Sequence, residues 1–251
     1  MKKIQRLKSL NKRYLFLGGT SGIGYDVAKR LLDQNNYLYF VSRNEEKLFK
    51  LFSNYTEYSS ILVDFNFPED LFDKLSAYNF KNKLDGLVYC VGVEETFPIK
   101  LYNQDKLTKL FNINFFSLFQ SLRFFSNKLI SNNNSSIVVL SSVMSEMGQP
   151  GKTAYCSSKS AITGLIKSLS LELSSRKITV NSISPSIITT PMGDKIISKL
   201  SESQLSEFNY KHPLGFGEVN DITELILFLL SDKSKWITGQ NIKIDGGYSS
   251  I

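Results

Sequence analysis

The sequence predicts an α/β fold in which helices cover both faces of a doubly wound parallel sheet. Three observations support this prediction. Short apolar runs of strand length alternate with segments of helical spacing throughout the 251 residues, the first apolar run ends in glycines, and no linker divides the chain. Regular alternation of this kind is typical of βαβ units with a buried parallel sheet. We therefore expect one domain over residues 1–251.

The first half of the chain alternates regularly. Runs rich in β-branched and aromatic residues predict strands, and apolar residues three and four apart predict helices. Strands are predicted at 14–19, 37–42, 59–65 and 84–92. Helices are predicted at 22–34, 44–55 and 68–80, the last with Pro68 near its start, where a missing amide donor is tolerated.

The second half opens with the apolar-rich segment 103–130, which predicts one long helix. Further strands are predicted at 135–142, 178–185 and 241–247, and further helices at 153–176 and 221–232. The stretch 187–213 lacks a clear period, and we expect irregular structure there.

Composition excludes several classes of protein. The net charge of +7 is spread without a block of five like charges, which argues against a nucleic-acid-binding arm. Two cysteines outside any C-x-x-C and one histidine provide no zinc site, and they fit a reducing cytoplasm. No run approaches 18 apolar residues, so no membrane span is expected. The basic N-terminus has only a short apolar run, and we do not expect a signal peptide.

A glycine loop follows the first predicted strand. Gly18–Gly24 reads GGTSGIG and leads into a predicted helix. Glycines let the backbone approach a dinucleotide pyrophosphate, and the helix N-terminus supplies amide donors. The spacing is G-x-x-x-G-x-G rather than the G-x-G-x-x-G fingerprint, and a simple tight turn is the alternative.

Tyr155 and Lys159 are four residues apart in a predicted helix, so they share a face. An ammonium beside a phenol favours the phenolate and lowers a pKa that is otherwise about 10. This pattern indicates a phenol that exchanges protons, and an ordinary surface pair is the alternative.

These motifs together resemble those of the short-chain dehydrogenase/reductase (SDR) family, nearest in pattern to 3-oxoacyl-[acyl-carrier-protein] reductases. The resemblance rests on G-x-x-x-G-I-G after the first strand, Ser142 thirteen residues before Y-x-x-x-K, and DGG near the end, and it extends from Tyr14 to Tyr248. It implies a Rossmann-type fold with seven parallel strands, a nicotinamide cofactor and interconversion of a carbonyl with an alcohol. It also implies a substrate lid at about 189–213.

The resemblance assigns roles to four residues. Ser142 would bind the substrate oxygen, Tyr155 would donate its proton, and Lys159 would lower the tyrosine pKa and bind ribose. Asn114 would complete the tetrad by holding a water that links Lys159 to solvent, although a helix can carry an asparagine for local reasons. The family's motifs change here at Leu17, at 89–92 and at Ser186, but no reacting group is lost.

The end of the second predicted strand favours NADP(H) over NAD(H). Ser42 stands where NAD-dependent members have Asp, and Arg43 follows, placed to pair with a 2′-phosphate. A solvated loop arginine is the alternative. The resemblance further places Asp64 at the adenine, and Ile188 and Thr190 at the carboxamide.

The expected cofactor-binding residues are Gly18, Thr20, Ser21, Gly22, Ile23, Gly24, Ser42, Arg43, Asp64, Phe65, Gly92, Tyr155, Lys159, Ile188 and Thr190.

The substrate is less determined by the sequence. Arg176 matches a basic position that the resembled reductases use against an acidic acyl carrier protein, but their second basic patch is replaced by Ser131–Ser136, which has no cation. A carrier-bound 3-oxoacyl group and another small carbonyl or sugar-type compound both stay open. The residues expected to flank the substrate mouth are Glu94, Glu95, Glu146 and Gln149.

We also have expectations about the oligomeric state of the protein and about whether it is an enzyme. The predicted helices 103–130 and 153–176 carry more apolar residues than one sheet-facing stripe needs, and the resemblance implies a homotetramer or homodimer paired through them. The rival to an enzyme is a non-enzymatic NADP-binding regulator on the same fold. Retention of all four tetrad residues favours the enzyme.

Overall fold

The computed structural model describes residues 12–198 and 200–250. The basic N-terminal segment, over which we expected no signal peptide, lies almost entirely outside the described residues. Within them, no helix is both long enough and apolar enough to cross a membrane.

All seven strands form one parallel sheet with the order β3-β2-β1-β4-β5-β6-β7. The order reverses between β1 and β4, and ligands of doubly wound sheets bind at such a switch point, beyond the carboxyl ends of the strands. The strands are β1 Arg13–Leu17, β2 Tyr37–Ser42, β3 Tyr58–Leu62, β4 Leu84–Tyr89, β5 Ser131–Leu140, β6 Thr179–Pro185 and β7 Asn241–Ile244.

The α-helices of the described residues are α1 Gly22–Asp33, α2 Glu45–Phe52, α3 Pro68–Ala77, α4 Gln104–Phe111, α5 Ser117–Phe125, α6 Thr153–Glu172, α7 Pro191–Ile197, α8 Glu202–Tyr210 and α9 Val219–Leu229.

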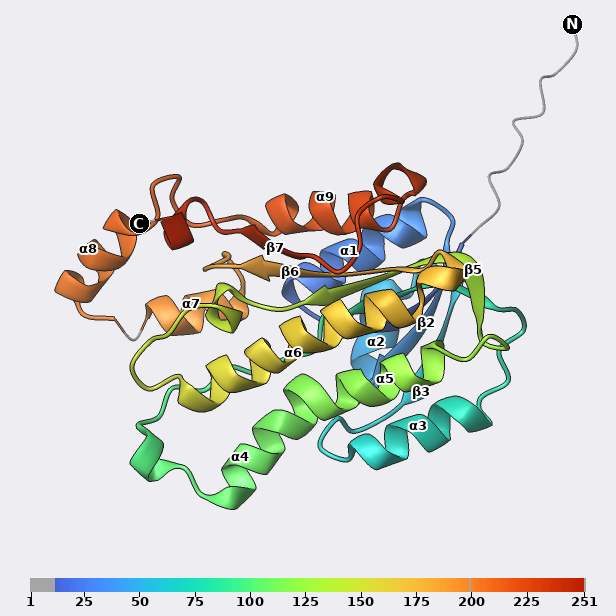
Figure 1. Ribbon diagram of the computed structural model, residues 1–251, viewed down its shortest axis with the longest axis horizontal. Helices are drawn as coiled ribbons and strands as arrows, with labels where there is room; N and C mark the ends of the chain where they lie inside the picture. Colours follow the sequence, from blue (N-terminus) through green and yellow to red (C-terminus); the bar gives the residue numbers. More distant parts are fainter. Residues whose placement is uncertain (1–11, 199, 251) are drawn as a thin grey trace, which may run out of the picture.

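Two apolar cores lie on opposite faces of the sheet. Successive residues of β1 alternate between them, because side chains of a strand point to opposite faces. One core joins the sheet to α1, α2 and α9, and the other joins it to α3, α5 and α6 (Figure 1). The fold is therefore the predicted three-layer, doubly wound arrangement.

The predicted long helix 103–130 was wrong in detail. The run is interrupted by a π-helix at Asn112–Phe116 between α4 and α5, and it ends at Phe125, so that β5 begins earlier than expected, at Ser131. The π-helix is also bonded from outside the helix: the fully buried Tyr89 hydroxyl donates to Ile113 O at 2.8 Å. Apolar periodicity does not reveal a turn with one added residue.

The stretch 187–213 is more regular than we expected. It holds α7 and α8, which extend beyond the carboxyl ends of the strands (Figure 1). Each helix has a side-chain cap, because Thr190 accepts from Gly193 N and Ser201 forms a capping box with Gln204. These S/T-x-x-Q and T-P signals are present in the sequence and predict both helix starts.

Candidate active site

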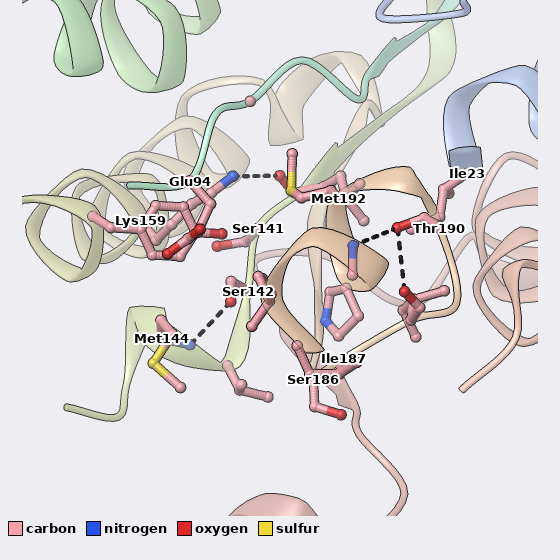
Figure 2. Close-up of a pocket in the computed structure, with 18 of the residues that line it drawn as sticks. Ile23, Glu94, Ser141, Ser142, Met144, Lys159, Ser186, Ile187, Thr190 and Met192 are labelled. Atoms are coloured by element: carbon pink, nitrogen blue, oxygen red, sulfur yellow. Dashed lines mark hydrogen bonds between the residues drawn. The ribbon is translucent and has the colours of Figure 1, made fainter. Parts of the chain in front are cut away.

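A cavity lies where β4, β5 and β6 end, and α7 and α8 border it. Gly92, Ser142, Tyr155, Lys159 and Thr190 all contribute to its wall. Figure 2 shows Ser141, Ser142 and Lys159 from the β5 and α6 side, and Thr190 and Met192 from the α7 side. The cavity adjoins a wider outer groove that also includes Ser21 and Arg43. The topology thus brings together residues far apart in the sequence.

The glycine loop leaves no room for side chains. A Cβ on Gly24 would lie 2.0 Å from Gly18 O, and a Cβ on Gly18 would lie 2.7 Å from the Cys90 carbonyl carbon. Gly18 and Gly22 also have φ of +89° and +52°, which favours glycine. Ser21 precedes α1 but does not cap it through its side chain. The first backbone N–H groups of α1 therefore stay available as hydrogen-bond donors. This geometry suits an anion such as a pyrophosphate.

Asn114 is fully buried within the π-helix. Its Oδ1 accepts from Val93 N at 2.8 Å, and its Nδ2 donates to Val93 O at 3.0 Å and to Ser158 Oγ at 3.1 Å. A Cβ on Gly92 would lie 3.5 Å from Asn114 Oδ1 and 3.4 Å from Lys159 Nζ. Asn114 therefore ties the loop after β4 to α6 beside the Lys159 ammonium.

Ser142 follows β5 in extended backbone and is almost fully buried. Its Oγ accepts from Met144 N at 3.2 Å, shown as a dashed line in Figure 2. Because that bond uses the oxygen as an acceptor, the hydroxyl proton is available for another oxygen in the cavity.

Tyr155 and Lys159 lie one turn apart on α6, and both are buried. Lys159 Nζ lies 5.9 Å from the centroid of the Tyr155 ring and donates to Leu140 O at 3.2 Å. Burial raises the pKa of Tyr155 to about 12, with the Ser142 hydroxyl acting in the opposite direction. Burial also lowers the pKa of Lys159 to about 8. The pKa of Tyr155 is thus shifted in the direction opposite to the one we expected, because desolvation by burial is the largest influence on it.

The end of β2 borders the outer groove through Arg43. Arg43 is exposed, lines the outer groove and forms no ion pair with any residue from 12 to 198 or 200 to 250. Ser42 is buried, and its Oγ accepts from Asn44 N at 3.1 Å. Asp64 is exposed after β3, where it accepts from Asn66 N at 3.0 Å.

The remaining predicted cofactor residues divide into two groups. Ile23, Gly92, Ile188 and Thr190 line the cavity. The other group borders neither the cavity nor the outer groove and consists of Gly18, Thr20, Gly22, Gly24, Ser42, Asp64 and Phe65.

Only part of the predicted substrate mouth is found at the cavity. Glu94 and Gln149 line it, whereas Glu95 and Glu146 do not. Glu146 instead accepts from Asn241 Nδ2 at 2.8 Å and pairs with Lys243 Nζ at 3.0 Å. One side-chain amide and one ammonium of β7 thus bind Glu146 outside the cavity.

Arg176, predicted to face an acidic carrier protein, is half-buried and donates hydrogen bonds to backbone carbonyls of this chain. Its guanidinium donates to Ser126 O at 2.8 Å and to Ser131 O at 2.7 Å, and it also reaches Ser131 Oγ at 2.9 Å. It thereby supplies hydrogen-bond donors to backbone carbonyls at the end of α5 and the start of β5. The role of Arg176 against an acidic carrier protein stays a prediction.

Two residues that line the cavity were not expected from the sequence. Lys152 is buried beside Glu94, and His212 is buried in the segment after α8. His212 stacks on Tyr248 with ring centroids 4.5 Å apart, and its Nδ1 lies 2.7 Å from Phe208 O. The carbonyl can only accept, so Nδ1 carries the proton and Nε2 is the acceptor in the neutral ring. No spacing signal points to either residue, because each depends on a loop packed against a distant one.

Comparison with known proteins gives a consistent match. Residues 18–249 match the family described as enoyl-(acyl carrier protein) reductase. The 3-oxoacyl-[acyl-carrier-protein] reductase FabG of Rickettsia conorii is 35% identical over 242 residues, which cover 94% of this chain and 96% of that protein.

Solved structures share the fold over nearly the whole chain. The 4-hydroxyisoleucine dehydrogenase complexed with NADH has a TM-score of 0.87 and 28% identity, covering 96% of this chain and 100% of that one. ElxO with NADP bound has a TM-score of 0.81 and 29% identity, with coverage of 96% and 100%. These two neighbours hold different nicotinamide cofactors, so likeness of fold alone does not decide between them.

Proposed function

The chain belongs to the short-chain dehydrogenase/reductase family and is an oxidoreductase acting on the CH–OH/C=O couple, and from this premise we propose that it reduces a 3-oxoacyl thioester with NADPH. One observation carries the proposal. A phenol, a hydroxyl with a free proton and an ammonium line one buried cavity, contributed by Tyr155, Ser142 and Lys159.

In the proposed reaction, the bound nicotinamide supplies hydride to the carbonyl carbon. Ser142 donates a hydrogen bond to the carbonyl oxygen through its free hydroxyl and orients it, keeping its proton. Tyr155 transfers its proton to that oxygen as negative charge develops there. Lys159 stabilises the resulting phenolate through its ammonium, and Asn114 fixes the loop that carries Gly92 beside it.

The proposed cofactor site combines the glycine loop before α1 with the residues at the end of β2. The glycine loop and the free amides of α1 fit the pyrophosphate, with Gly18, Gly22 and Gly24 leaving the backbone open. Arg43 supports the choice of NADPH, because its exposed guanidinium lines the outer groove, where it would pair with a 2′-phosphate, and Ser42 offers no carboxylate to repel that phosphate.

The wall of the cavity supports an acyl substrate. Apolar side chains face it from three elements, and they include Val143, Met144, Met192, Ile196 and Phe208. Such a wall favours burial of a short acyl chain. The names of the relatives make an acyl carrier protein the proposed thiol carrier, docked without help from Arg176.

A second candidate is reduction of another small carbonyl compound that carries a hydroxyl. One observation favours it: Nε2 of the buried His212 has no hydrogen-bond partner among the described residues, and His212 lines the cavity. An acceptor of this kind suits a hydroxyl of a sugar-type substrate.

The test uses the purified full chain with NADPH and three carbonyl compounds: an acetoacetyl thioester of N-acetylcysteamine, an aldose and an isolated ketone. Faster NADPH consumption with the thioester than with the aldose supports the first candidate, and the reverse order supports the second. Absence of turnover with all three, while NADPH still binds, contradicts the proposal of a small-carbonyl reductase.

We also propose how the chain is divided into a domain and a lid. We treat residues 1–251 as one domain, in which the segment of about 189–213 is the substrate lid. Limited proteolysis with and without NADPH and thioester tests the lid, since closure over ligand protects its backbone from cleavage.

A further inference from the structure

A buried ion pair stands in the wall of the cavity. Lys152 Nζ contacts Glu94 Oε1, and the two side chains are only 8% and 13% exposed. Thr96 Oγ1 donates to the same carboxylate oxygen at 2.7 Å. Both charged residues border the cavity and also the outer groove, so they lie where one opens into the other. A substrate that enters from the groove passes this pair.

The backbone holds the pair in place. Lys152 directly precedes α6, and Glu94 lies in the loop after β4. Phe97 N donates to Gly151 O at 2.8 Å, which joins the loop of Glu94 to the turn before Lys152. Gly151 has φ of +81°, and a Cβ there would meet Thr96 Cγ2 at 3.0 Å. The two charges therefore meet through a close, built contact of two loops.

The ammonium has unused donors beside the reacting phenol. An ammonium carries three N–H groups, and Glu94 is the sole hydrogen-bond partner of Lys152 Nζ within 12–198 and 200–250. Lys152 Nζ lies 5.6 Å from the centroid of the Tyr155 ring. A buried donor without an acceptor is unfavourable, so an acceptor oxygen of a substrate at Tyr155 would be bound strongly.

The charges of Lys152 and Glu94 determine which kind of substrate oxygen can bind beside them. Lys152 and Glu94 are neutral together, and the Glu94 carboxylate repels an anion placed beside Lys152. A neutral carbonyl oxygen suits this environment better than a carboxylate. In a 3-oxoacyl thioester or ester, a single methylene separates the reacting carbonyl from a second, neutral carbonyl. That second oxygen lies close to the first, as Lys152 lies close to Tyr155.

Building on the proposed function, we propose that Lys152 donates a hydrogen bond to the second carbonyl oxygen of a 1,3-dicarbonyl substrate, while Glu94 positions Lys152 and excludes free acids. The chain then prefers neutral 3-oxoacyl thioesters and esters to isolated ketones, which lack the second oxygen, and to 3-oxo acids, which carry a charge there.

The first test compares Lys152→Met with the wild type on S-acetoacetyl-N-acetylcysteamine and on 2-pentanone, with NADPH consumption as the readout. Loss of one hydrogen bond from a charged donor lowers kcat/KM for the thioester by roughly 10- to 100-fold, while the ketone changes by less than about threefold. Lys152→Arg keeps a cationic donor and restores most of the preference. Lys29→Met, which breaks the exposed pair with Asp33, is the matched control and leaves both rates unchanged.

The second test uses Glu94→Gln. It leaves Lys152 without a counter-charge, so the ratio of kcat/KM for acetoacetate to that for the thioester rises by about tenfold. Equal effects of Lys152→Met on thioester and ketone, or an unchanged acid-to-thioester ratio in Glu94→Gln, overturn the inference even when the wild type is active. A wild type that turns over none of these compounds instead overturns the proposed function. NADPH binding by each variant shows that it is folded.

Discussion

Nζ of Lys159 lies 5.9 Å from the centroid of the Tyr155 ring and donates to Leu140 O at 3.2 Å. Burial raises the pKa of the phenol to about 12 and lowers the pKa of the amine to about 8. At neutral pH the phenol therefore holds its proton, which is the state that donation to a carbonyl requires.

Replacing Tyr155 with phenylalanine removes the proton donor and keeps the ring. We expect kcat for carbonyl reduction to fall on the order of a hundred- to ten-thousand-fold, with NADPH affinity nearly unchanged. Steady-state kinetics and NADPH fluorescence titration measure the two quantities. Tyr58→Phe removes a hydroxyl outside the cavity and serves as the control. Retained turnover in Tyr155→Phe would show that another group supplies the proton.

Replacing Arg43 with alanine removes the exposed guanidinium at the end of β2. We expect NADPH affinity to fall roughly 10- to 100-fold, the effect of losing a charged hydrogen bond, and NADH affinity to stay the same. Ser42→Asp adds a carboxylate and lowers NADPH affinity further by repulsion. Lys50→Ala on α2 is the control. Equal losses for both cofactors in Arg43→Ala would contradict the 2′-phosphate assignment.

Lys159 gives the cofactor-free protein a distinct pH dependence of stability. Its folded pKa of about 8 lies below the usual 10.5, so the unfolded chain binds more protons between these values. The free energy of unfolding therefore rises with pH across that window. Relative to Lys159→Met, the wild type gains about 1 to 2 kcal/mol between roughly pH 7.5 and 9.5. Urea unfolding of both proteins measures this gain, and parallel pH curves would show that Lys159 titrates normally.

Arg176→Ala tests the internal role of that arginine. The substitution removes the donors to Ser126 O and Ser131 O, and we expect the free energy of unfolding to fall by about 2 to 3 kcal/mol. The KM for an acetoacetyl thioester and its salt dependence with an acyl carrier protein stay unchanged. Lys177→Ala, at the next position, is the control. A KM effect with carrier protein and no loss of stability would instead show that Arg176 is a docking residue.

Association of subunits through the α4–α6 side is a further expectation. Phe116, Phe119 and Leu171 are 44%, 46% and 75% exposed and lie in the two segments through which we expected subunits to pair. Phe119→Lys should shift a dimer or tetramer toward the monomer, as measured by light scattering after gel filtration. Lys109→Ala, on the same side, is the control. A monomeric wild type would contradict the expectation.

The sequence predicted the structure well where a local pattern of residue types is enough to determine it. The glycines at 18, 22 and 24, the tetrad spacing and the alternating strands all follow from local patterns, and the fold is confirmed. The position of Lys152 beside Glu94 depends instead on the contact between Phe97 and Gly151, which no periodicity reports. The tyrosine pKa could not be predicted either, because its direction depends on how deeply the fold buries the phenol.

The π-helix has a consequence for tolerance of length changes. A π turn holds one residue more than an α turn, so deleting one residue from Asn112–Phe116 would give a continuous α-helix and rotate one side by about 100° against the other. Either Asn114 would leave Val93 and Ser158, or Leu118 and Leu122 would leave the core. In this segment, a relative shorter by one residue has therefore lost either the tetrad or the packing of α5, whereas substitutions that keep the length preserve both.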